Sequence, residues 1–219
     1  LILAIVSIRF WKENKKITLF SWLVVLGMGF QAWLGATVVY SVLEPVKITT
    51  HMLMALVIVA LLLYVIHSSE KRAKEFQYRK NLVALLLLTL AITLVQITLG
   101  TQVRQFVDTQ IDMIGETTKN LWLQNANWQF YVHRSFSIVV VLLNLLLAQI
   151  IYRNGLGYSK MNWVLLILFI EVLTGIAMYY YDFPFATQPI HLILASLLFG
   201  VQFYLVLEAF NARKRHKSL

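Results

Sequence analysis

The chain has 219 residues, of which 59% are hydrophobic and 13% charged, and its mean hydropathy is +0.72. This composition excludes a soluble globular domain and predicts an integral membrane protein. The formal net charge of +9 does not indicate nucleic acid as a partner, because the basic residues lie between apolar runs and serve to set membrane orientation. No cysteine is present, which excludes disulfides, iron–sulfur clusters and thiolate metal sites and leaves histidine and carboxylate as cofactor ligands.

Apolar runs predict the transmembrane elements. Six of them approach the roughly 20 residues that a helix needs to cross the hydrocarbon core. They cover residues 17–40, 48–67, 81–103, 130–152, 161–181 and 189–210. They are too long and too evenly apolar for barrel strands, so the expected fold class is all-α with six complete transmembrane helices. The shorter apolar segment from Leu1 to Ile8 is interpreted as the inner end of one further span that begins upstream of Leu1.

The distribution of Lys and Arg predicts the topology. Fifteen of the 19 basic residues lie before the first run, between the second and third, between the fourth and fifth, and after the sixth. The positive-inside rule makes this side cytoplasmic, or the matrix side in an organelle. The opposite side carries acidic residues, namely Glu44, Asp108, Asp112, Glu116 and Asp182. We therefore expect a multi-pass protein of the bacterial inner membrane whose histidines lie toward the periplasm.

An internal repeat links three pairs of runs. Each copy has Gln or Glu followed four residues later by Gly near the outer end of an outgoing helix, and then a histidine near the outer end of the returning helix. The copies are Gln31, Gly35 and His51; Gln96, Gly100 and His133; and Glu171, Gly175 and His191. A polar outer loop, residues 105–129, lengthens the second copy. The glycines allow close approach of a neighbouring helix or of a flat ligand, and their common offset from a histidine favours the ligand.

The histidines are the candidate ligands, because an ionisable side chain in a membrane helix normally faces the bundle interior and binds something. His133 and His191 begin parallel helices at the same depth, so they are candidates for the two axial ligands of one haem iron in a four-helix bundle. The alternative for a single histidine is a hydrogen-bonded packing residue. Glu171 is either protonated and hydrogen-bonded or part of a proton path. His67 and His216, among Lys and Arg at inner ends, are assigned no role.

Two arginines on the outer side are candidate partners for carboxylates. Arg104 ends the third run and Arg134 follows His133. Haem propionates lie at the rim of the macrocycle, and a guanidinium pairs with a carboxylate through two parallel hydrogen bonds. The alternative is that each arginine reaches outward to the lipid headgroups. Both alternatives stay open, and the propionate role is the one expected here for Arg104 and Arg134.

At these residues the chain resembles the haem A synthase family, eight-helix membrane enzymes that oxidise haem O to haem A for cytochrome oxidase. The resemblance extends over essentially the whole chain and depends on the order and spacing of several short motifs. These are Gln31-Ala-Trp-Leu-Gly35 before His51, Gly100-Thr-Gln-Val-Arg104, His133-Arg134, and Pro189-Ile-His191 before Leu197-Leu-Phe-Gly200.

The resemblance implies two pseudo-symmetric four-helix bundles. Residues 1–68 would be the remainder of the N-terminal bundle, which takes the substrate haem; residues 69–80 a cytoplasmic or matrix linker; and residues 81–219 the C-terminal bundle, which holds haem b. By position, His133 and His191 match the haem b ligands and His51 matches a ligand of the substrate haem O. The catalytic residues would lie upstream of Leu1, including the first histidine of the substrate pair and an acidic residue.

The activity implied is oxidation of a haem O methyl group to a formyl group, in support of cytochrome oxidase assembly. Two alternatives stay open: a di-haem b-type membrane electron carrier with bis-histidine ligation, and a transporter with a histidine proton relay. The second is disfavoured because all three prolines lie in outer loops or at a helix start. Expected partners are membrane lipid, an electron acceptor and the farnesyltransferase that supplies haem O, with a second copy of the chain as an open alternative.

Overall fold

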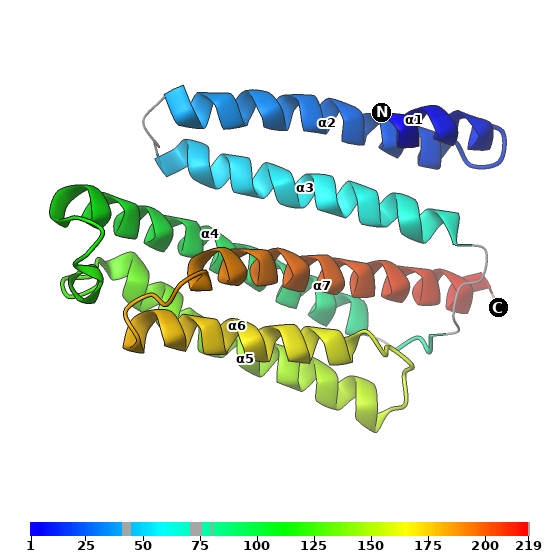
Figure 1. Cartoon of the computed structure of the whole chain (residues 1–219). Coiled ribbons are helices and arrows are strands. Elements are labelled where there is room, and N and C mark those ends of the chain that lie inside the picture. The colour runs from blue at the N-terminus through cyan, green and yellow to red at the C-terminus, as the bar shows by residue number, and fades with distance from the viewer. Residues whose placement is uncertain (41–44, 71–75, 80, 219) are drawn as a thin grey trace. The chain divides into compact units, whose positions relative to one another are not determined.

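The computed structural model describes residues 1–40, 45–70, 76–79 and 81–218, and α-helices dominate these ranges (Figure 1). The elements are α1 (Ile2–Ser7), the 3₁₀-helix η1 (Ile8–Phe10), α2 (Lys15–Tyr40), α3 (Pro45–Ser69), α4 (Leu82–Ile114), η2 (Lys119–Leu121), α5 (Trp128–Arg153), α6 (Met161–Tyr180) and α7 (Thr187–Ser218). No strand occurs in the described ranges. The all-α prediction is therefore confirmed.

The chain forms two compact units, Leu1–Glu75 and Phe76–Leu219. Within the predicted linker 69–80, residues 71–75 and 80 lie outside the described part, and so does the acidic residue Glu44 of the first outer loop. The assignment of one haem to each half of the chain stays a prediction.

The first unit is a helical hairpin with a short additional helix. α2 packs along α3, and α1 packs against α2. Thr18 Oγ1 donates a buried hydrogen bond of 2.6 Å to the Ser7 carbonyl, and this bond joins α2 to α1. The rings of Phe20 and Tyr64 contact each other across the hairpin in a tilted arrangement, with centroids 4.4 Å apart. These contacts fix the register of α2 and α3, on which the position of His51 depends.

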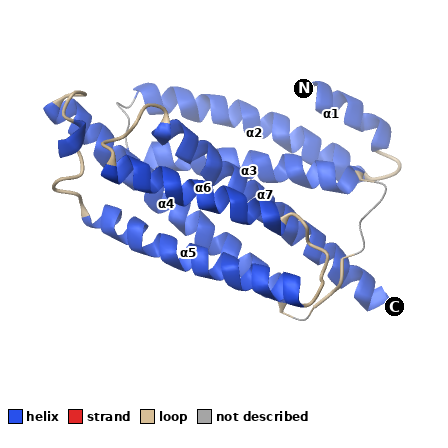
Figure 2. Ribbon diagram, turned by 60° about the horizontal axis from the view of Figure 1, so that its bottom comes forward, coloured by secondary structure: helices blue, strands red, loops and turns tan. Residues whose placement is uncertain are grey.

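The second unit is a four-helix bundle. α4 packs against α5 and α7, and α6 also packs against α5 and α7 (Figures 1 and 2). α5 and α7 are therefore diagonally opposite, and both run antiparallel to α4 and α6. This arrangement places the starts of α5 and α7 at the same end of the bundle. His133 and His191 lie near those starts, on opposite sides of the bundle core.

Two buried amides connect the diagonal helices below the histidines. Asn144 on α5 and Gln202 on α7 each stand eleven positions after a histidine of their own helix, and both are buried. Gln202 Nε2 donates a hydrogen bond of 3.0 Å to Asn144 Oδ1, and Asn144 Nδ2 donates to the Val140 carbonyl. A bond between buried amides specifies helix register, because a slip would leave both groups unsatisfied. The equal spacing therefore keeps His133 and His191 at one level.

At the inner end of the same bundle, Lys160 forms an ion pair with the buried Glu208 and lies over the ring of Tyr204, 4.5 Å from its centroid. Tyr158 is buried beside this pair and stacks on Phe76. Burial, and secondarily the negative charge of Glu208, raises the pKa of Tyr158 to about 12. These contacts fasten the inner loop between α5 and α6 to α7.

The structure corrects the predicted outer loop 105–129. α4 continues without interruption to Ile114, so residues 105–114 are helical. The remaining segment folds onto the end of the bundle, where Trp122 packs in a buried cluster with Val107 and Phe183. Trp122 Nε1 also donates to the Gly115 carbonyl at 3.2 Å. Trp122 is therefore buried in an apolar cluster that joins this loop to the end of α4 and to the segment after α6.

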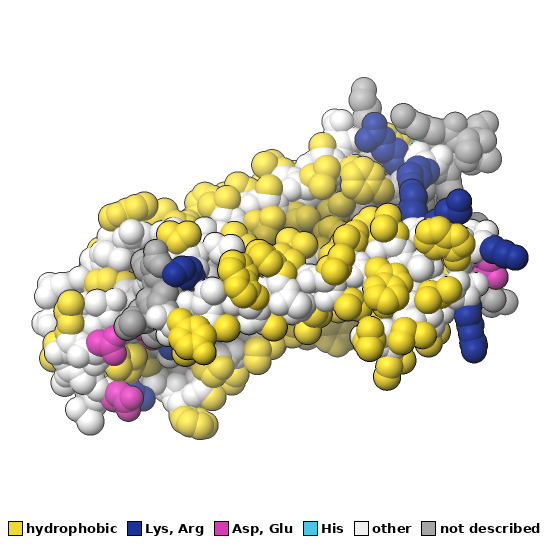
Figure 3. Space-filling view, turned by 90° about the horizontal axis from the view of Figure 1, so that it is seen from above, with side chains coloured by type: hydrophobic (Ala, Val, Ile, Leu, Met, Phe, Trp, Pro, Cys, Tyr) yellow, Lys and Arg dark blue, Asp and Glu magenta, His cyan; other side chains and the backbone are white. Residues whose placement is uncertain are grey.

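Six helices are long and apolar enough to cross a membrane, within Lys15–Tyr40, Val46–Ser69, Leu82–Ile114, Trp128–Arg153, Met161–Tyr180 and Thr187–Lys214. Figure 3 shows apolar side chains along the sides of the helices and most visible Lys and Arg near helix ends. In the second unit Arg153, Lys160 and Arg213 lie at the end of the bundle opposite Asp108 and Asp182. The chain is a multi-pass membrane protein.

Candidate functional site

The three copies of the repeat form the same local structure. In each, the imidazole of the returning helix packs on the glycine of the outgoing helix. A Cβ atom added at Gly35 would lie 3.2 Å from His51 Cε1, and one at Gly100 would lie 3.1 Å from His133 Cε1. At Gly175 the distance to His191 Cε1 would be 3.6 Å. The glycines therefore admit the histidine ring itself. We call the three arrangements the His51, His133 and His191 sites.

At the His51 site, Gln31 of α2 contacts His51 of α3 twice. Gln31 Nε2 donates a hydrogen bond of 3.0 Å to the backbone carbonyl of His51, and it also lies 3.3 Å from His51 Nε2. Gln31 Oε1 and His51 Nδ1 are buried and have no hydrogen-bond partner among the described residues. This site is therefore incompletely satisfied.

At the His133 site, Gln96 of α4 repeats one of these contacts and omits the other. Gln96 Nε2 donates to the backbone carbonyl of His133 at 3.0 Å. The ring is held instead by the backbone, since His133 Nδ1 lies 3.2 Å from the Gln96 carbonyl and donates to it. The hydrogen on Nδ1 leaves a lone pair on Nε2, which is the atom that a metal would take.

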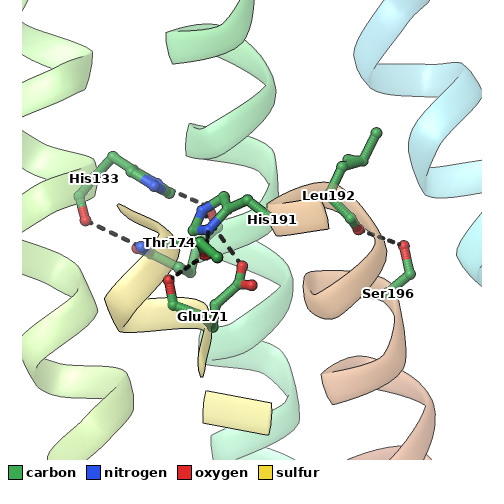
Figure 4. A network of polar contacts seen from close by, with 7 residues as sticks. His133, Glu171, Thr174, His191, Leu192 and Ser196 are labelled. Atoms are coloured by element: carbon green, nitrogen blue, oxygen red, sulfur yellow. Dashed lines mark hydrogen bonds and ion pairs between the residues drawn. The ribbon is translucent and has the colours of Figure 1, made fainter. Parts of the chain in front are cut away.

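At the His191 site, a threonine holds the ring. His191 Nδ1 lies 2.8 Å from Thr174 Oγ1, and that hydroxyl donates to the Glu171 carbonyl at 2.9 Å (Figure 4). The hydroxyl hydrogen is thereby committed to Glu171, so His191 Nδ1 is the donor to Thr174. His191 Nε2 faces Glu171 Oε1 at 3.4 Å. As at His133, the protein holds Nδ1 by a hydrogen bond, but here Nε2 also has a carboxyl group beside it.

His133 and His191 come from the diagonal helices α5 and α7, and Figure 4 shows their side chains directed toward one another. The predicted pair is thus brought together within the second unit. Buried oxygen atoms without hydrogen-bond partners among the described residues also gather here, namely Gln96 Oε1 and Glu171 Oε2. Orphaned buried polar atoms normally mark a position where water, an ion or a ligand completes the bonding.

Both predicted arginines already have protein partners. Arg104 Nη2 lies 2.8 Å from Asp108 Oδ1, and Arg104 also hydrogen-bonds Gln188 at the start of α7. Arg134 lies over the ring of Tyr179, 4.8 Å from its centroid, with its Nη2 3.5 Å from the Tyr180 hydroxyl. Neither arginine contacts a histidine site, so their propionate roles stay predictions.

Sequence reasoning missed Thr174 and the backbone carbonyl of Gln96. The position of Thr174 carries a signal, since it stands three residues after the Gln or Glu of its copy, where the other copies have Leu34 and Leu99. A hydroxyl at one of three equivalent positions in an apolar helix is informative, because it can hydrogen-bond a ring on a neighbouring helix. The carbonyl of Gln96 has no equivalent signal, because every residue carries one.

His67 and His216 were assigned no role. His67 is half-buried near the end of α3, whereas His216 is exposed and stacks on Tyr78, with ring centroids 4.7 Å apart. Neither belongs to a copy of the repeat.

Comparison with protein-family models identifies the family. A family model described as COX15-CtaA, cytochrome oxidase assembly protein, matches residues 1–203, a range that includes all three histidine sites. No curated protein matches the chain. The family match agrees with the resemblance to haem A synthases, and it gives no support to the electron-carrier alternative. The chain therefore belongs to the COX15-CtaA family, and its role is in cytochrome oxidase assembly.

Proposed function

We propose that the chain acts in the oxidation of a haem O methyl group to a formyl group, the haem A synthase reaction. In this proposal His133 and His191 hold a haem b cofactor, and His51 contributes a ligand to the substrate haem. The observation that supports it most is the pair of imidazoles on diagonal helices, which are directed toward one another and each have Nδ1 hydrogen-bonded. Metal-ligating histidines normally have this arrangement.

The donor set suits haem better than a metal held by protein side chains alone. Among the described residues no group of three or more His, Asp or Glu side chains is arranged to hold a metal ion. A haem iron needs only two axial ligands from the protein, because the macrocycle supplies the other four. Two imidazoles in an apolar bundle, next to two orphaned oxygens, fit that requirement.

When bound, haem b would supply a one-electron redox centre. The residues of the chain would orient the ligands and enclose the site. Thr174 and the Gln96 carbonyl orient the two imidazoles, the glycines let those rings lie against α4 and α6, and apolar helix faces exclude water. Arg104 and Arg134 would anchor propionates at the outer end. To do so, Arg104 would either leave its ion pair with Asp108 or bind Asp108 and a propionate at the same time.

The wider setting is part of the same proposal. The protein would lie in the bacterial inner membrane with its histidine sites toward the periplasm. Its partners would be an electron acceptor and the farnesyltransferase that makes haem O.

The haem b assignment is tested by the visible spectrum of the purified protein. We expect a low-spin haem b spectrum, and we expect His133→Ala or His191→Ala to abolish it, because one axial imidazole is lost. His216→Ala, which changes an exposed histidine, should leave the spectrum unchanged. An unchanged low-spin spectrum in either of the first two variants would remove that residue from the ligand pair.

The reaction itself is tested by supplying haem O and an electron acceptor to the full-length protein and measuring formyl-bearing haem by mass spectrometry. We expect the product to form in the parent protein and to be lost in His51→Ala. A protein that takes up haem and exchanges electrons but forms no formyl product would be the di-haem carrier instead.

A further inference from the structure

The three histidine sites differ in which imidazole nitrogen the protein occupies. At His133 and His191 the hydrogen bonds hold Nδ1. At His51 the contact is with Nε2, 3.3 Å from the Gln31 amide nitrogen, while Nδ1 is buried without a partner among the described residues. The nitrogen that is left for a metal at His133 is thus covered by an amide at His51, and at His191 it faces Glu171 Oε1 at 3.4 Å.

The orientation of the Gln31 amide follows from its second contact. Its nitrogen donates to the backbone carbonyl of His51 at 3.0 Å, a bond that the amide oxygen cannot make. An amide nitrogen carries two hydrogens, and the remaining one is available to His51 Nε2. His51 Nε2 is therefore the acceptor, and the ring hydrogen is on Nδ1.

Sequence differences at equivalent positions account for the contrast. Leu34 of the first copy stands where Thr174 stands in the third, so no hydroxyl is present to hold His51 Nδ1. At the second copy Gln96 donates to the backbone carbonyl of its histidine, as Gln31 does, but its amide does not bond the ring. At the third copy Glu171 Oε1 lies 3.4 Å from His191 Nε2, and a carboxyl group can donate to that nitrogen only in its protonated form, whereas the Gln31 amide always carries its hydrogens.

We propose that Gln31 gates ligation at His51, because its amide occupies the imidazole nitrogen that an iron porphyrin needs and makes binding there readily reversible. The inference rests on the proposed function, in which His51 binds the substrate haem. For an iron to bind, the hydrogen bond from Gln31 to Nε2 breaks and the Nε2–iron bond forms, with no change in protonation of the ring. His133 Nε2 has no amide competitor of this kind, and haem held by the His133 and His191 pair is retained.

This difference suits two haems with different fates. A substrate has to enter, react and leave, whereas a cofactor has to stay. The net contribution of one hydrogen bond corresponds to about a two- to tenfold change in an equilibrium constant. Competition from Gln31 should therefore weaken haem binding at His51 by about that factor, without preventing it.

The test is the rate at which the haem-loaded, full-length protein transfers haem to excess apomyoglobin. We expect a fast phase from the His51 site and a slow phase from the His133 and His191 pair. Gln31→Leu and Gln31→Met, which remove the amide N–H groups at similar volume, should slow the fast phase about two- to tenfold. Gln149→Leu is the control, because it makes the same change at an exposed position of α5 outside the three histidine sites; it should leave the fast phase unchanged.

The outcomes separate the gate from the proposed function. If His51→Ala leaves the fast phase in place, the exchangeable haem does not use His51, and the proposed substrate site fails. If His51→Ala removes the fast phase but both Gln31 variants exchange haem at the parent rate, the gate is wrong and the substrate site stands. Should both Gln31 variants fold poorly, ¹⁵N NMR of histidine-labelled, haem-free parent protein decides: a hydrogen-bonded Nε2 at His51 supports the gate, and a free one overturns it.

Discussion

At the residue scale, glycine is required in the repeat because an imidazole occupies the space of its side chain. The first and second copies leave 3.2 Å and 3.1 Å between an added Cβ and the histidine Cε1, closer than ordinary van der Waals contact. The ring cannot retreat far, since its other atoms are hydrogen-bonded or packed between helices. The histidine and the glycine are thus one structural unit, although 33 positions separate Gly100 from His133.

Gly100→Ala should therefore displace the His133 ring and reduce haem b content, at a cost of about 1–3 kcal/mol for overpacking. Haem per protein and the low-spin spectrum are the measurements. Gly175→Ala should reduce haem b content less than Gly100→Ala does, because its added Cβ would lie 3.6 Å from His191 Cε1, which is ordinary van der Waals contact. Gly29→Ala, with no atom within 4 Å of its Cβ, should change neither. Equal haem content in all three variants would contradict the packing argument.

At the element scale, the continuation of α4 to Ile114 decides the surroundings of Arg104. Had the helix ended at residue 103, Arg104 would have been a terminal residue with lipid headgroups as its alternative partner. In the helix it stands one turn before Asp108 and forms an ion pair with it. The Arg104 side chain is 48% exposed, so this pair contributes about 0.5 kcal/mol or less, and a propionate can compete with Asp108 for the guanidinium.

Arg104→Ala should lower haem affinity about five- to tenfold if the guanidinium anchors a propionate. Arg104→Lys should be intermediate, because it keeps the charge but loses the planar pair of donors. Asp108→Asn is the control that separates the roles: it frees Arg104, so haem binding should stay equal or tighten. If Arg104→Ala keeps the haem affinity and midpoint potential of the parent protein, the arginine interacts only with Asp108, Gln188 and the membrane surface.

At the scale of the whole molecule, charge at the helix ends and apolar helix sides define one membrane orientation. The basic ends of α5 and α7 and the start of α6 lie together in the second unit, opposite the loop that contains Trp122. Both histidine helices of that unit begin at the Trp122 end. Orientation in the membrane therefore determines from which side the histidine sites are reached.

Single-cysteine labelling tests this orientation without background, since the chain has no cysteine of its own. Labels at residues 154–160 and after 210 should report the cytoplasmic or matrix side, and labels at 115–127 the opposite side. A membrane-impermeant reagent applied to intact cells distinguishes the two. Labelling of any one of these segments from the wrong side would remove the histidines from a common face and contradict the bis-histidine site.

Much of the architecture could be predicted from the sequence because membrane insertion acts on local properties. Apolar runs of the right length and the asymmetry of Lys and Arg predicted six spans and their direction, and the structure places helices on all six. Helix ends were less predictable: α4 extends beyond its apolar run because Arg104 and Asp108 pair on its surface and Val107 packs against the loop that follows. Those contacts are tertiary and leave no hydropathy signal.

Composition was sufficient to predict the class of protein. Regular spacing was sufficient to find the three-copy repeat and to select His51, His133 and His191 as candidate site residues. Three features became visible only in the tertiary structure. α5 and α7 lie diagonally, a histidine ring packs on each glycine of the repeat, and a different ring nitrogen is hydrogen-bonded at His51 than at the other two sites. The physical reason is that a hydrogen bond is specified to a few tenths of an ångström and within a narrow range of angles. That precision depends on how whole helices pack, and no pattern along one helix encodes it.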